Sequence, residues 1–88
     1  MAALSFGERI RAKRLALLAN DPRFTLRQLA ARLGIQPSYL SRLERGAIPS
    51  LSEEHLLALA RELHDDPDIL CVLTGKLPGD VRRILLNA

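Results

Sequence analysis

The chain has 88 residues, of which 48% are hydrophobic and 3% aromatic, with a formal net charge of +3. This length fits one domain over residues 1–88 and excludes a second, and a core of aliphatic side chains suits packed helices better than a β-sandwich. The single cysteine excludes an internal disulfide and a cysteine metal site, and no apolar run approaches the roughly 18 residues of a membrane span, so we expect a cytoplasmic protein.

The first predicted helix runs from Phe6 to about Leu18. Ser5 is placed to cap it, and Glu8 at the third helical position completes a capping box. The Asn20-Asp21-Pro22 run ends this helix and opens a short basic loop through Arg23.

Two short helices follow. Thr25, with Gln28 three positions later, predicts a second capping box, and Gly34 ends the second helix as a left-handed residue. The third helix has Gln36 as its N-cap and Pro37 at its first position, where the missing N–H has no effect on helix hydrogen bonding. It continues to about Arg45 and is closed by Gly46.

The remaining predicted elements are also helices. Ser52 caps a fourth helix to about His64, and Asp66-Pro67 begins a short fifth helix to Leu73. A last helix begins at Pro78 or Gly79 and carries Val81, Ile84, Leu85 and Leu86. The chain is therefore predicted to be all-α, with five or six helices.

The segment from about Thr25 to Gly46 meets the mechanical requirements of a helix-turn-helix. Two short helices join at Gly34, the small Ala30 allows the second helix to pass closely, and Ile35 fills the angle between them. Such a unit presents its second helix as a rigid probe for the major groove of DNA.

The same segment resembles the Cro/phage-repressor family, also called the xenobiotic-response-element (XRE) family. The resemblance is carried by Leu29-Ala30, by Leu33-Gly34-Ile35 and above all by the run Ser38-Tyr39-Leu40-Ser41-Arg42-Leu43-Glu44-Arg45-Gly46. It extends over roughly residues 6–73 and implies a lambda-repressor-like helical bundle in which helices two and three read DNA.

Carried over by position, the resemblance implies that the third helix contacts base edges. Pro37, Ser38 and Arg42 take these roles, with Gln36, Tyr39 and Ser41 nearby. Pro37 stands where relatives often have glutamine, so its contact with a base is limited to an apolar one. The planar guanidinium of Arg42 is suited to guanine O6 and N7, although phosphate binding or simple solvation are alternatives.

Phosphate contacts are expected at the start of the second helix and the end of the third. Thr25, Arg27 and Gln28 lie where free N–H groups and the helix dipole attract an anion, and Arg45 is a further candidate, with dipole complementarity as its simpler explanation. The resemblance also implies an internal ion pair between Arg14 and Glu44.

Charge and composition address the partners. Residues 1–46 contain nine Arg or Lys and three Asp or Glu, a charge of +6, whereas residues 47–88 carry −3; this indicates a side that faces a polyanion, or an ordinary solvated surface. We expect a homodimeric repressor that reads an inverted repeat, with helices over residues 67–87 as the dimer surface. The alternative is an antitoxin-like subunit that binds a partner protein through residues 65–88.

We expect no catalytic, cofactor or metal site, because His55 and His64 are nine positions apart and neither adjoins the cysteine.

Overall fold

The structure, a computed structural model, describes residues 5–47 and 51–74, and that part of the chain contains helices and no strand. The elements in chain order are α1 (Phe6–Leu18), the 3-10 helix η1 (Pro22–Phe24), α2 (Leu26–Leu33), α3 (Pro37–Glu44), α4 (Glu53–Glu62) and α5 (Pro67–Leu73). The predicted all-α class is confirmed. The last predicted helix, with Val81, Ile84, Leu85 and Leu86, lies outside the described residues.

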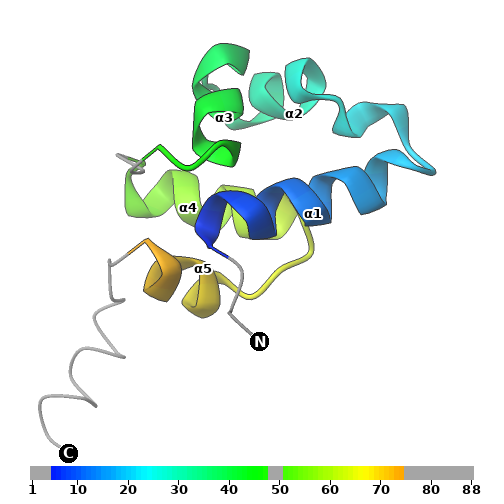
Figure 1. Ribbon diagram of the computed structural model, residues 1–88. Coiled ribbons are helices and arrows are strands. Elements are labelled where there is room, and N and C mark those ends of the chain that lie inside the picture. Colours follow the sequence, from blue (N-terminus) through cyan, green and yellow to red (C-terminus); the bar gives the residue numbers. More distant parts are fainter. Residues whose placement is uncertain (1–4, 48–50, 75–88) are drawn as a thin grey trace, which may run out of the picture.

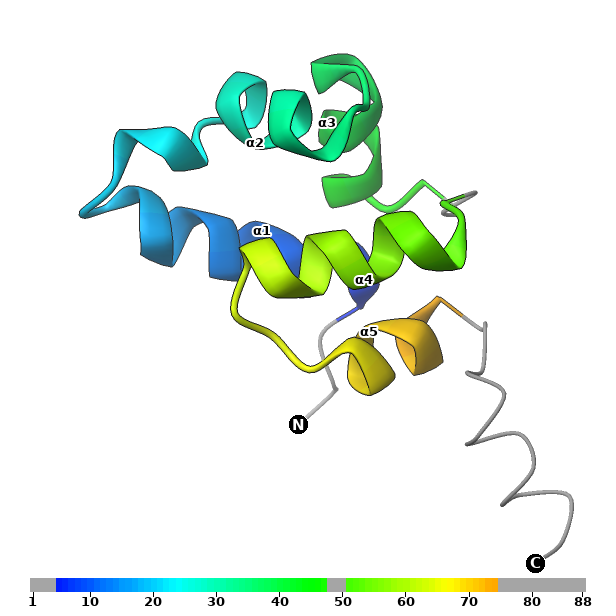
Figure 2. The same cartoon turned by 180° about the vertical axis from the view of Figure 1, so that it is seen from behind.

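The helices pack in three levels (Figures 1 and 2). The α2–α3 pair lies at the top of both views, α1 and α4 lie below it, and α5 lies beneath α4. Contacts run from α1 to α3, from α2 to α3 and α4, and from α4 to α5. The α2–α3 pair therefore rests on a helical platform and turns its other side outward.

The core is built almost wholly of aliphatic side chains from every helix, as the composition predicts. Its buried hydrophobic members are Phe6, Ile10, Phe24, Leu29, Ala30, Leu33, Leu40, Leu43, Leu51, Leu56, Leu59, Ala60, Leu63, Leu70 and Cys71. Because these residues recur at three- and four-residue spacings, each short helix buries one face.

Side-chain caps account for the predicted starts of α1, α2, α4 and α5, whereas Gln36, the N-cap of α3, makes no side-chain hydrogen bond to its helix. The Ser5 hydroxyl accepts from the Glu8 N–H, and the Glu8 carboxylate accepts from the Ser5 N–H, both at 3.3 Å. Thr25, Ser52 and Asp66 also accept backbone hydrogen bonds in the first turns of α2, α4 and α5. Thr25 forms only this half of the capping box predicted with Gln28. Each cap satisfies an N–H group that the helix leaves unpaired.

The helix ends agree less closely with the prediction. α3 ends at Glu44, within a residue of the expected position, but α4 ends at Glu62 instead of continuing to His64. His64 adopts a left-handed φ of 55°, and the next N–H, that of Asp65, donates to the Ala60 carbonyl at 2.9 Å. A residue in the left-handed conformation ends a helix whatever its side chain. Because this position is usually a glycine, a histidine there does not indicate a helix end in the sequence.

An ion pair joins α1 to the segment after α4. The Arg9 guanidinium donates to both oxygens of Asp65 at 2.7 Å, and the Asp65 side chain is only 3% exposed. The hydrogen bonds from Arg9 hold the pKa of the Asp65 carboxyl below its usual value. Because residues 9 and 65 are far apart in the chain, this pair is a tertiary contact that ties α1 to the segment between α4 and α5.

This pair makes a prediction about acid stability. Because the pKa of Asp65 is lowered on folding, the pair's contribution is complete above the unfolded-state pKa of about 4 and is lost as the pH falls through the folded-state pKa. Asp65→Asn should therefore be less stable than the wild type at pH 7, and the difference should shrink below about pH 4. Urea unfolding at both pH values measures this. Arg9→Met should likewise be less stable than the wild type at pH 7, by a difference that shrinks below about pH 4. A difference in stability that does not change with pH would contradict this role for the pair.

Candidate nucleic-acid interface

α2 and α3 are held as a rigid pair by their inner faces. Ala30 and Leu40 are fully buried, and Leu43 is also buried without exposed surface. Gly34 between the helices has a φ of 71°, and the N–H of Ile35 donates back to the Ala30 carbonyl at 3.1 Å. This closes α2 in the left-handed turn that the sequence predicts.

The outer face of α3 carries the residues predicted to contact bases. Gln36, Pro37, Ser38 and Arg42 are exposed, and Tyr39 and Ser41 are half-buried. The Arg42 guanidinium carbon lies 5.7 Å from the centroid of the Tyr39 ring. A cation placed over an aromatic ring loses some rotational freedom before it meets a ligand. The helix thus presents a short, partly ordered polar surface to solvent.

The residues predicted to contact phosphate lie at the start of α2 and just after the end of α3. Thr25, Arg27 and Gln28 are exposed at the start of α2, and Arg45 is exposed just after α3. The Thr25 hydroxyl accepts from the Gln28 N–H at 3.2 Å. This leaves the N–H groups of Leu26 and Arg27 as the ones that an anion could approach in the first turn.

Arg14 and Glu44 form a buried ion pair between α1 and α3. The guanidinium Nε and Nη2 donate to the two Glu44 oxygens at 2.6 and 3.0 Å, and the side chains are 8% and 4% exposed. Arg14 Nη1 also donates to the Phe24 carbonyl at 3.1 Å. The pair neutralises the only acid of α3, so that this helix does not carry an uncompensated negative charge toward an anionic partner.

The comparisons with known proteins agree with this geometry. A family model described as a helix-turn-helix domain matches residues 5–68. The chain belongs to the helix-turn-helix domain family. No curated protein and no solved structure shows a significant match. Together with the helices of the described residues, the family match identifies an all-α, lambda-repressor-like fold and indicates a DNA-binding regulator.

One part of this helix-turn-helix domain was not expected from the sequence. The Asn20–Phe24 segment, predicted as a loop, contains η1, which is stabilised at its start by Asp21. The Asp21 carboxylate accepts from the backbone N–H and the guanidinium of Arg23, and these hydrogen bonds lower the pKa of Asp21 to about 2. The Arg23 guanidinium is engaged with this carboxylate in the structure.

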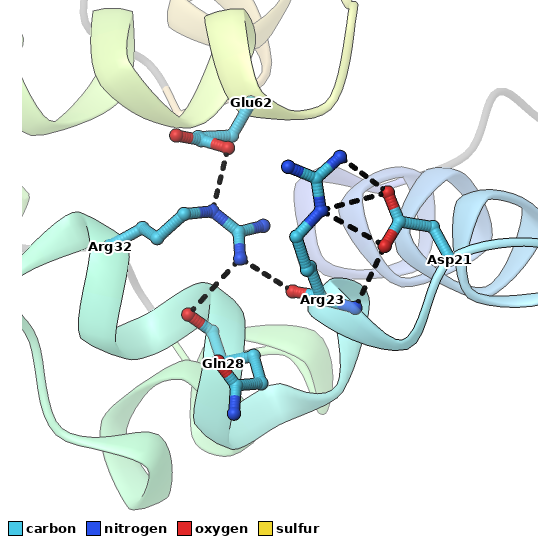
Figure 3. A network of polar contacts seen from close by, with 5 residues as sticks. All are labelled: Asp21, Arg23, Gln28, Arg32 and Glu62. Carbon is cyan, nitrogen blue, oxygen red and sulfur yellow. Dashed lines mark hydrogen bonds and ion pairs between the residues drawn. The ribbon is translucent and has the colours of Figure 1, made fainter.

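Arg32 of α2 holds this segment against the rest of the helix-turn-helix domain, as Figure 3 shows. Its Nε donates to Glu62 of α4 at 2.9 Å, and its Nη1 donates to the Arg23 carbonyl at 2.7 Å. The guanidinium carbon also lies 5.0 Å from the centroid of the Phe24 ring. Arg14 and Arg32 therefore bind consecutive carbonyls just before Thr25, which positions the start of α2 from both sides.

Within residues 5–47 and 51–74, no helix is long and apolar enough to cross a membrane. In the same ranges, no group of three or more His, Cys, Asp or Glu side chains is arranged to hold a metal ion.

Proposed function

We propose that this helix-turn-helix domain is a sequence-specific transcriptional regulator of the Cro/phage-repressor type, a cytoplasmic homodimeric repressor that reads an inverted repeat. The observation that carries this proposal is the two-sided character of α3. Leu40 and Leu43 fix its inner face in the core, while Ser38 and Arg42 stand on its outer face. A helix held in this way is able to enter a major groove without losing its packing.

α5 supports the proposed dimer. Ile69 and Val72 are 41% and 52% exposed, and together with Asp68 and Leu73 they line a shallow hollow of about 210 Å³. A domain of this size gains stability from extra apolar burial, and two copies bind more phosphates than one. In a two-fold dimer the α3 helices would lie about 34 Å apart, one turn of the duplex.

Selection of bound sequences from random duplex DNA tests the proposal. We expect recovery of an inverted repeat whose half-sites are centred about one helical turn apart. Recovery of no preferred sequence would overturn sequence-specific regulation, and recovery of a single half-site would overturn the dimer.

The same apolar face of α5 also fits a second candidate function, an antitoxin-like subunit that binds another protein through residues 65–88 as well as DNA. Sedimentation of the purified chain separates the two functions. A dimer at micromolar concentration favours the repressor, and a monomer favours the subunit.

Arg42→Ala should relax sequence specificity. If Arg42 binds a guanine through two hydrogen bonds, its loss weakens binding to the selected site by about 1–3 kcal/mol and leaves binding to random DNA nearly unchanged. Filter-binding titrations on both duplexes measure the two affinities. Arg27→Ala is the matched control, because a phosphate contact should be lost equally on both. An equal loss for Arg42→Ala would contradict a base-reading role.

A further inference from the structure

A hollow of about 500 Å³ opens where α1, α2 and α3 meet. It is lined by Arg11, Arg14, Leu26, Ser41, Glu44 and Arg45. Its walls thus include the start of α2 and the end of α3, the two places where phosphate contacts were predicted. α1, for which the sequence predicts no DNA contact, supplies the third wall.

The charges of this hollow do not balance. Glu44 is its only acid, and both of its oxygens are occupied by Arg14. Arg11 and Arg45 are exposed, and neither has an ion-pair partner among residues 5–47 and 51–74. Two cations therefore remain over a floor that is electrically neutral, and this arrangement attracts an anion.

The other groups in the hollow suit a phosphodiester in particular. Ser41 is half-buried beside Arg45 and provides a hydroxyl donor, and the half-buried Leu26 gives an apolar surface. A nucleic-acid backbone presents an anionic phosphate next to an apolar sugar face. An isolated carboxylate would use the two arginines but would have no use for the apolar wall.

We propose that this hollow binds a phosphate of the DNA backbone, held by Arg11 of α1 together with Arg45. The inference rests on the proposed function and adds a DNA contact from α1. Phosphate contacts set the orientation of a protein on the duplex. A contact from α1, the helix that packs against α3, fixes the angle at which α3 enters the groove.

The test is a series of filter-binding titrations on cognate and random duplexes at several salt concentrations. Arg11→Ala should weaken binding to both duplexes about tenfold, as expected for one charged hydrogen bond, and lower the slope of log K against log salt by about 0.9. Arg11→Lys keeps the charge and should retain most of the slope. Arg61→Ala is the matched control, since Arg61 is an exposed arginine of α4 in a hollow that no α3 residue lines.

Double variants test whether the two arginines share one phosphate. In the Arg11→Ala/Arg45→Ala double variant, the fold-loss of DNA affinity should be smaller than the product of the two single losses, because both residues bind one phosphate. In the Arg11→Ala/Arg27→Ala double variant, it should equal that product, because these residues bind different phosphates. An unchanged salt slope for Arg11→Ala, or a loss of affinity confined to cognate DNA, overturns the inference. The proposed function still stands in that case if the wild type binds DNA specifically. Absence of DNA binding by the wild type overturns both.

Discussion

Glu44→Gln is expected to lower the free energy of unfolding by about 3–5 kcal/mol, because it leaves the buried Arg14 charge without its counter-ion. The substitution keeps the volume of the side chain, removes its charge and replaces one of the two oxygens that accept from Arg14 by an NH2 group that cannot accept. Arg14 is 8% exposed, so water replaces little of the lost interaction. Such a loss is a large part of the roughly 5–15 kcal/mol that stabilises a typical domain. Urea unfolding followed by circular dichroism measures it.

Two further variants isolate the cause. Glu54→Gln removes an exposed carboxylate from the first turn of α4 and should change stability by less than about 1 kcal/mol. Arg14→Met combined with Glu44→Leu removes both charges and should be more stable than Glu44→Gln alone. A remainder of about 1–3 kcal/mol is expected, since the Phe24 carbonyl loses the hydrogen bond from Arg14. If the double variant is as unstable as Glu44→Gln alone, the buried charge is not the cause.

Gly7→Ala should destabilise the protein, although replacing a helical glycine by alanine normally stabilises by up to about 1 kcal/mol. A Cβ at Gly7 would lie 2.3 Å from the Leu43 carbonyl oxygen and 2.9 Å from that of Glu44. Both contacts are with backbone, which has no alternative rotamer, so α1 and α3 would have to separate. We expect a loss of about 3 kcal/mol, measured by thermal or urea unfolding.

Gly34→Ala provides the comparison for Gly7→Ala. A Cβ at Gly34 meets nothing within 4 Å, but its φ of 71° disfavours alanine. The expected loss is about 1–2 kcal/mol from backbone conformation alone. A smaller loss at Gly7 than at Gly34, or a gain at Gly7, would mean that α1 and α3 do not approach as closely as the structure shows.

The features that were predictable from the sequence are the local ones. Ser5, Thr25 and Asp66 are capping residues whose hydrogen bonds reach only two or three positions ahead, so their helices could be located from short patterns. Gly34 marked the turn for the same reason. The Arg14–Glu44 pair spans 30 positions and was accessible only through the family resemblance.

The features that could not be predicted from the sequence depend on contacts between residues far apart in the chain. Arg32 reaches Glu62 across 30 positions and Arg9 reaches Asp65 across 56, and no spacing rule relates such residues. Gly7 lies within α1, where no turn requires a glycine. A side chain is excluded there because the backbone of α3 lies too close. Arg11 likewise meets Leu26 and Arg45 only in the folded chain, so no sequence pattern indicates the phosphate contact proposed for it.

Tyr39 also gives the protein an intrinsic fluorophore on the helix proposed to read DNA. It is the only tyrosine, and the sequence contains no tryptophan, so ultraviolet-excited emission arises almost entirely from one ring on α3. That ring is half-buried beneath the Arg42 guanidinium, and movement of the guanidinium onto a base would change the ring's surroundings. Groove occupancy would then be visible as a change in intrinsic emission, without a dye or an engineered fluorophore.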